Sequence, residues 1–124
     1  MNWPRKYLRL ALDSENNMQG EKEVVGKCPM QYLPLDLLRG TAEVFARNCV
    51  DNGGKYARDN YRRPIDPNLL IGSLLRHLTE IQRALRTDEG SYLIDNESKC
   101  EHIDHLISNA IILKAALDNW GDEK

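Results

Sequence analysis

The chain has few of the features that mark membrane, secreted or zinc-finger proteins. It contains three cysteines in 124 residues, Cys28, Cys49 and Cys100, and their spacing is unpaired, so we expect reduced thiols. No apolar run approaches the roughly 18 residues of a membrane span, and the N-terminus lacks a signal-peptide pattern. These absences predict a cytoplasmic protein with no membrane partner.

Strong charge of one sign and aromatic bulk are also missing. The net charge of -2 argues against a nucleic acid polymer or an anionic membrane as a partner. The hydrophobic fraction of 41% is typical of a globular domain, but a single phenylalanine leaves the expected core thin. We therefore expect association through an apolar surface, as a homo-oligomer.

Three amphipathic segments predict a mostly α protein, an antiparallel helical bundle. They run from about Leu35 to Val50, from Asn68 to about Arg86, and from about Asn96 to Trp120. Asp66-Pro67 favours the start of the second helix, and the Asn and Gly residues at 51–54 favour the end of the first. Residues 1–32 are expected to form an arm, in which residues 5–12 alternate like one short strand, and residues 33–120 the all-α domain.

The expected third helix carries a stripe of carboxylates. Glu97, Glu101 and Asp104 follow one another at i, i+4 and i+7, so they would share one helical face. Carboxylates one turn apart can hold Mg²⁺, which prefers hard oxygen ligands. The alternative is a solvated acidic start of a helix, where the helix dipole favours acids.

A second stripe on the same helix holds His102, His105 and Asn109, at the border of the apolar face. His77 occupies an equivalent border on the second helix, which predicts one pocket shared by all four residues. They could contact a ligand, or they could be core-edge groups bonded to backbone or to each other. A zinc site completed by His77 is a third alternative, although no cysteine or carboxylate spacing supports it.

Cations and tyrosines gather in the segment 55–63. Its cations, Lys55, Arg58, Arg62 and Arg63, could bind phosphates, and the faces of Tyr56 and Tyr61 could stack on a base. Arg76, on the second helix, could reach a phosphate with its planar guanidinium. The alternatives are an ordinary solvated loop and a surface arginine.

Six short motifs resemble a known family in their order and spacing. They are Leu35-Asp36-Leu37-Leu38, Ala42-Glu43-Val44-Phe45, Lys55-Tyr56 with Asn60-Tyr61, Leu75-Arg76-His77, Asp95-x-Glu97-Ser98, and His102-x-x-His105 with Asn109. The chain resembles, over roughly residues 33–117, the N-terminal domain of the phage dATP/dGTP diphosphohydrolases, relatives of the MazG-like all-α nucleotide pyrophosphohydrolases. The resemblance implies a helical fold, a nucleotide ligand, Mg²⁺ or Mn²⁺, an oligomer with sites near subunit interfaces, and a phage protein in the bacterial host.

The resemblance also carries over individual residues. The matching positions are Lys55, Tyr56, Asn60, Arg76, His77, Asp95, Glu97, His102, His105 and Asn109, with Glu43 at a shifted spacing. The wider group pairs an E-x-x-E segment with an E-x-x-D segment. Only Glu101-x-x-Asp104 is evident here, and the family's glycine after Glu-Ser is Lys99.

Two functions follow from the resemblance. The first is a metal-dependent (deoxy)nucleoside triphosphate pyrophosphohydrolase in which Glu97, Glu101 and Asp104 hold the metal and serve catalysis. The second is a protein that sequesters a nucleotide, such as a host defence signal, without cleaving it, which would explain the missing carboxylates. A module that kept the fold for interaction alone is a third alternative.

Overall fold

The computed structural model describes residues 26–120. The chain divides into two compact units, residues 1–33 and 34–124. The described part of the first unit contains one short 3-10 helix, Met30–Tyr32. The strand expected over residues 5–12 lies outside the described residues.

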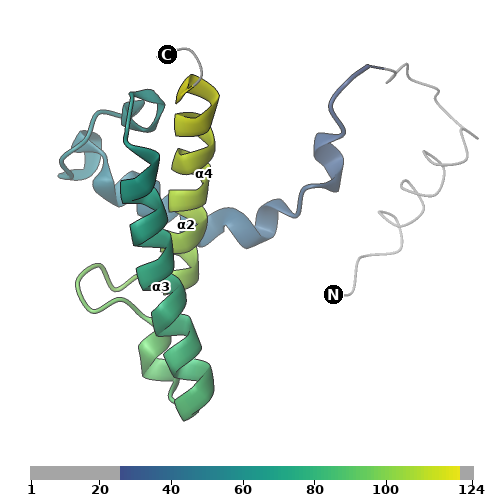
Figure 1. The fold of residues 1–124 in the computed structure, drawn as a ribbon. Helices are drawn as coiled ribbons and strands as arrows, with labels where there is room; N and C mark the ends of the chain where they lie inside the picture. Colours follow the sequence, from purple (N-terminus) through teal and green to yellow (C-terminus); the bar gives the residue numbers. More distant parts are fainter. Residues whose placement is uncertain (1–25, 121–124) are drawn as a thin grey trace, which may run out of the picture. The chain divides into compact units, whose positions relative to one another are not determined.

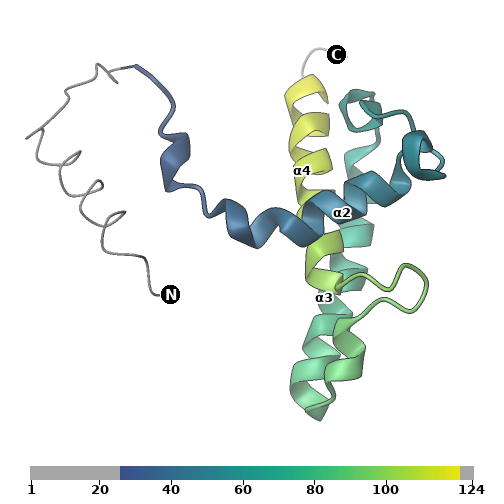
Figure 2. The same ribbon diagram turned by 180° about the vertical axis from the view of Figure 1, so that it is seen from behind.

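The second unit confirms the prediction of a mostly helical protein. Its helices are α2 (Arg39–Asn48), α3 (Pro67–Thr87) and α4 (His102–Trp120), and short 3-10 helices cover Leu35–Leu38, Val50–Asn52, Asn60–Arg62 and Gly90–Leu93. Figure 1 shows α3 and α4 side by side and antiparallel, and Figure 2 shows α2 crossing them. Between residues 26 and 120 there is no β-strand, only two isolated bridges.

The second predicted helix is confirmed to within one residue at each end. Asp66 caps the N-terminus of α3 by accepting a hydrogen bond from the backbone N–H of Asn68 at 3.0 Å, and Pro67 occupies the first turn. Asp88 ends the helix in the left-handed conformation, with its N–H bonded to the Ala84 carbonyl. Local sequence signals at its two ends were therefore sufficient to predict this helix.

The first predicted helix ends two residues early. Cys49 is extended and forms a parallel bridge with Tyr56, so the chain leaves α2 at Asn48. A Cβ at Gly54 would overlap the backbone of Asn48 and the Arg47 carbonyl oxygen. This glycine therefore lets the following loop lie directly against the end of α2.

The third predicted helix was wrong at its start, and the expected carboxylate stripe was wrong with it. Residues 94–101 form a tight loop closed by a bridge between Ile94 and Glu101, and α4 begins only at His102. The Asp95 carboxylate accepts hydrogen bonds from the Ser98 N–H at 2.9 Å and hydroxyl at 2.7 Å. Such side-chain bonds offer the backbone an alternative to a helix. Glu97 consequently lies on the loop.

The core of the described region is small. Its buried apolar residues are Val44, Cys49, Leu70, Ala84, Cys100 and Ala116, and the three cysteines are unpaired. Leu78 and Leu85 of α3 are 48% and 75% exposed. Over the described residues, no helix combines the length and apolarity needed to cross a membrane.

Candidate functional site

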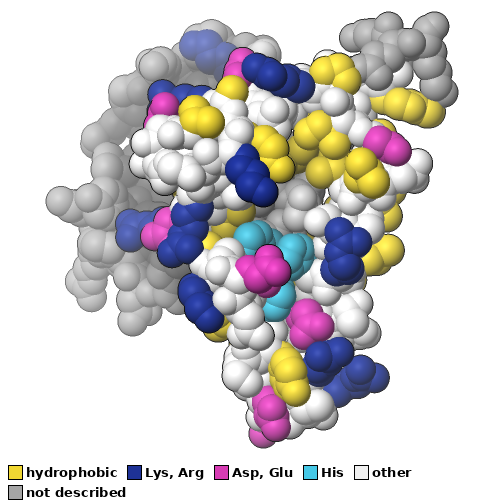
Figure 3. Space-filling view, turned by 90° about the vertical axis from the view of Figure 1, so that its left-hand side faces the viewer, with side chains coloured by type: hydrophobic (Ala, Val, Ile, Leu, Met, Phe, Trp, Pro, Cys, Tyr) yellow, Lys and Arg dark blue, Asp and Glu magenta, His cyan; other side chains and the backbone are white. Residues whose placement is uncertain are grey.

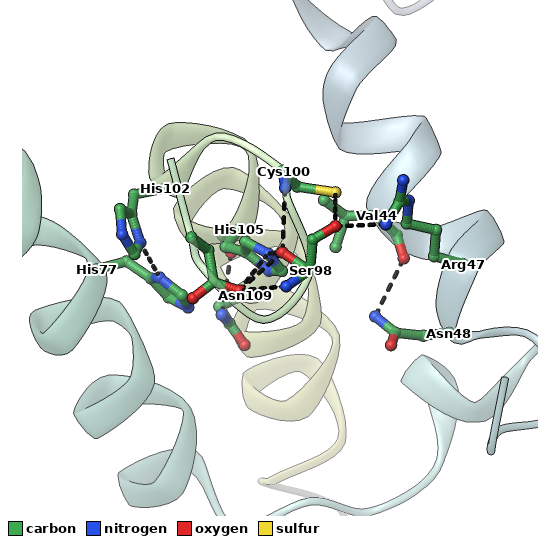
Figure 4. A network of polar contacts seen from close by, with 10 residues as sticks. Val44, Arg47, Asn48, His77, Ser98, Cys100, His102, His105 and Asn109 are labelled. Atoms are coloured by element: carbon green, nitrogen blue, oxygen red, sulfur yellow. Dashed lines mark hydrogen bonds and ion pairs between the residues drawn. The ribbon is translucent and has the colours of Figure 1, made fainter. Parts of the chain in front are cut away.

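A hydrogen-bonded loop at the start of α4 positions the first candidate residues (Figure 4). The Ser98 hydroxyl lies 2.7 Å from Asp95 Oδ2 and 2.6 Å from His105 Nε2, and it accepts the Cys100 N–H at 3.1 Å. Because the hydroxyl has one proton, donation to Asp95 requires His105 Nε2–H to donate to Ser98. All three hydrogen bonds are then satisfied, and His105 is left with Nδ1 as an acceptor. Arg47 ties this loop to α2 through a hydrogen bond to the Ser98 carbonyl.

The three histidines form one cluster between α3 and α4, and Figure 3 shows histidine side chains gathered around an acidic side chain at the surface. The His77 and His105 rings are stacked with centroids 4.7 Å apart and an interplanar angle of 5°. His77 Nδ1 lies 2.8 Å from Nδ1 of the buried His102, so one ring donates and the other accepts. This hydrogen bond requires that at least one of the His77 and His102 rings is neutral.

Burial and neighbouring charges shift the pKa values of His77, His105 and Asp95 in this cluster. Burial, reinforced by His105 and His102, holds the pKa of His77 below its ordinary value of 6.5. Burial also lowers the pKa of His105, although the charge of Asp95 partly opposes the shift. Burial would raise the pKa of Asp95, but hydrogen bonds from the Ser98 N–H and hydroxyl outweigh it and lower the value. The lowered pKa values favour the neutral forms of His77 and His105 and the ionised form of Asp95.

A pocket of about 430 Å³ opens beside this cluster, and we call it the aromatic pocket. Its volume lies within the usual range for small-ligand sites. The lining residues are Val44, Phe45, Asn48, Cys49, Tyr56, Ala57, Arg58, Asn60, Tyr61, Ile65, Leu70, His105, Ser108, Asn109 and Ile112. Phe45 and Tyr61 meet edge to face with centroids 5.8 Å apart. Three aromatic rings, three amides and one arginine suit a planar, polar-edged ligand.

A second cavity, of about 490 Å³, lies at the other edge of α2 and the start of α4, and we call it the acidic hollow. Its lining residues are Asp36, Leu37, Gly40, Glu43, Arg47, Lys99, Cys100, Glu101 and Asp104. A Cβ at Gly40 would overlap the carboxylate of Asp104, so the glycine lets Asp104 approach α2. Four carboxylates from three segments thus share this hollow with two cations.

The structure brings together some of the predicted site residues and separates others. Tyr56, Asn60, His105 and Asn109 line the aromatic pocket, and Glu101 and Asp104 line the acidic hollow. Lys55, Arg76, His77, Glu97 and His102 line neither cavity.

The three histidines contact one another, and two of the four residues expected in one pocket, His105 and Asn109, line the aromatic pocket. His77 stacks on His105 and pairs with His102, but neither His77 nor His102 is part of the lining of this pocket. Arg76 is exposed on α3, where its Nη2 lies 3.5 Å from Ser73 Oγ.

Sequence reasoning missed several residues of both cavities. Phe45 and Asn48 line the aromatic pocket, but the sequence predicted no binding role for either residue. Their sequence signal is the Ala42-Glu43-Val44-Phe45 motif, which Phe45 ends and which Asn48 follows by three residues. Asp36 lay within a motif but was given no role, although it lines the acidic hollow.

Comparison with known proteins gives one match. The family model described as dATP/dGTP diphosphohydrolase, N-terminal, matches residues 17–124. No curated protein and no solved structure matches the chain. Since the family match covers most of the chain and includes both cavities, the chain belongs to the dATP/dGTP diphosphohydrolase N-terminal family.

Proposed function

We propose that this protein binds a purine deoxynucleoside triphosphate and cleaves it with water into the monophosphate and pyrophosphate. The observation that carries this proposal is the pairing of an aromatic pocket with an acidic hollow on the same two helices. Val44 and Asn48 face the pocket while Glu43 and Arg47 of the same helix face the hollow. A nucleotide needs both a stacking site and a charged site, and α2 and α4 supply both.

The base is assigned to the aromatic pocket. The rings of Phe45, Tyr56 and Tyr61 offer faces and edges against which a purine can stack, a contact worth about 1–3 kcal/mol per base. Arg58 lines the same pocket and supplies a positive charge on the loop. The phosphates would extend toward the acidic hollow, where Arg47 and Lys99 can offset their charge.

A divalent cation is the cofactor that the family resemblance implies. The hollow is lined by Glu43, Glu101 and Asp104, whose carboxylate oxygens are of the hard type that Mg²⁺ and Mn²⁺ prefer. Within the described residues no three such side chains are close enough to hold one ion, so these carboxylates would have to converge to bind it. When bound, the ion would offset phosphate charge and assist the attack of water at the α-phosphorus. In that reaction the bond from the α-phosphorus to the bridging oxygen breaks and pyrophosphate leaves.

Two observations favour the second candidate, a protein that sequesters the nucleotide uncleaved. Within the described part of the chain, no three acidic, histidine or cysteine side chains are close enough to hold one ion. In addition, Gly40 stands three residues before Glu43, where an E-x-x-E segment would carry its first glutamate. The aromatic pocket does not depend on either feature, so binding could persist without turnover.

Replacing two carboxylates of the acidic hollow by amides distinguishes the pyrophosphohydrolase from the sequestering protein. Under the proposed function, Glu101→Gln combined with Asp104→Asn should abolish pyrophosphate release, because amides hold divalent cations poorly. Under sequestration the same change should leave metal-free affinity unaltered or tighter, since negative charge near the phosphates is removed.

The measurements are pyrophosphate release with Mg²⁺ or Mn²⁺ across a panel of deoxynucleoside triphosphates, and calorimetry without metal. A matched control is Glu89→Gln with Asp118→Asn, since these acids are exposed and line neither cavity. If the unaltered protein neither binds nor cleaves any nucleotide, both candidates are wrong and an interaction module becomes the leading interpretation.

A further inference from the structure

Two asparagines of the aromatic pocket hold their amides in the same way. Asn48 Nδ2 donates to the Val44 carbonyl at 3.0 Å, and Asn109 Nδ2 donates to the His105 carbonyl at 2.9 Å. Each bond joins a side chain to the backbone four residues earlier in its own helix, α2 or α4. The amide nitrogen is thereby fixed toward the helix, which also fixes the position of the amide oxygen (Figure 4).

The amide oxygens remain available to a ligand. Both asparagines line the aromatic pocket, and among the residues that the structure describes no hydrogen bond reaches Oδ1 of either one. Asn109 is half-buried while Asn48 is more exposed. Because an amide oxygen accepts up to two hydrogen bonds, these two side chains give the pocket an edge that is rich in acceptors.

We infer that Asn109 and Asn48 select a base that carries an exocyclic amino group, through hydrogen bonds from that group to their Oδ1 atoms. This inference rests on the proposed function, because it assigns the base to the aromatic pocket. The two Oδ1 acceptors complement the exocyclic amino group of adenine or guanine. Hypoxanthine and unsubstituted purine lack this amino group, so they would leave the acceptors without that donor. A site built to pair with a ligand group rejects the analogue that lacks it, since its own polar atoms are then left unpaired.

The test uses two pairs of nucleotides that differ only in the amino group. One pair is dGTP and dITP, and the other is dATP and the deoxynucleoside triphosphate of unsubstituted purine. In at least one pair the amino-bearing member should bind the unaltered protein roughly 10-fold more tightly, which is the size expected for one hydrogen bond to a partly buried acceptor. Calorimetry without metal measures this ratio independently of turnover.

The asparagines are then tested by removing the acceptor. Asn109→Ala should reduce the preference to roughly 2-fold or less, and Asn48→Ala should reduce it by a smaller factor because Asn48 is more exposed. A role limited to packing would weaken both members of a pair equally and keep the ratio. Asn52→Ala is the matched control, because Asn52 also donates to a backbone carbonyl, that of Ala46 at 3.0 Å, but lies outside both cavities.

The outcomes separate this inference from the proposed function. Equal affinity within both pairs on the unaltered protein, or a preference retained by folded Asn109→Ala, overturns the inference while leaving nucleotide binding in place. Should Asn109→Ala fail to fold, the comparison on the unaltered protein together with Asn48→Ala decides the matter. Absence of binding to any of the four nucleotides overturns the proposed function as well.

Discussion

Replacing Ser98 with alanine tests the network that positions the start of α4. The substitution removes the hydroxyl that donates to Asp95 Oδ2 at 2.7 Å, pairs with His105 Nε2 at 2.6 Å and accepts the Cys100 N–H at 3.1 Å. A neutral hydrogen bond contributes about 0.5–1.5 kcal/mol and one to a charged group about 1.5–3 kcal/mol. The gross loss would therefore reach several kcal/mol if nothing rearranged.

Rearrangement reduces that loss. Asp95 keeps its bond from the Ser98 backbone N–H, and His105 Nε2 lies 3.8 Å from Asp95 Oδ2, close enough to form a direct bond after a small shift. We therefore expect Ser98→Ala to lower the free energy of unfolding by about 2 kcal/mol. For a domain of this size the melting temperature should fall by roughly 8–16 °C.

The assay is urea and thermal unfolding, with Ser73→Ala as the matched control. Ser73 lies on α3, and within residues 26–120 its hydroxyl has only a long hydrogen bond, 3.5 Å, from Arg76. Its replacement should therefore change stability by less than about 0.5 kcal/mol. If Ser98→Ala unfolds with the same free energy as the control, the loop is held by its backbone and by packing, and the reasoning is refuted.

Two further predictions concern the backbone and pH. Gly54→Ala should destabilise the fold by about 1–3 kcal/mol in urea unfolding, because its Cβ would overlap backbone atoms that cannot move aside. Gly90→Ala is the control and should be near neutral, since there is open space around its new Cβ. Equal effects of the two substitutions would contradict the close approach of Gly54 to α2. The pKa values of His77 and His105 are lowered from 6.5 in the folded protein, so the unfolded chain binds more protons than the folded chain. The stability that these neutral histidines contribute should be fully present above about pH 7 and should fall as the pH drops through the lowered values. Unfolding free energies measured across this range should show the fall, and His77→Gln should reduce it; a flat profile would contradict neutral histidines in the folded state.

The sequence by itself determined the helices whose ends carry local signals. The Asp66-Pro67 start and the apolar spacing predicted α3 almost to the residue, because capping and periodicity act over a few neighbouring positions. The motif residues Tyr56, Asn60, His105 and Asn109 were also identified in advance, and they lie around one pocket. These predictions needed no knowledge of how the helices pack.

The sequence misled where side chains compete with the backbone. The spacing of Glu97, Glu101 and Asp104 fits a helical stripe, yet the hydrogen bonds from Ser98 to Asp95 stabilise a loop across the first part of it. Both conformations are compatible with the local pattern. Additional contacts from outside the segment, including the Arg47 bond to the Ser98 carbonyl, favour the loop.

Only the tertiary structure decided which distant residues share a cavity. Asp36 and Glu43 lie opposite Glu101 and Asp104 because α2 crosses α4 closely at Gly40, where no side chain separates them. Likewise Asn48 and Asn109 meet around the aromatic pocket although they come from different helices. Periodicity determines which face of a helix a residue occupies. The position where two helices cross depends instead on the packing of all their side chains, and this position determines which residues form a site.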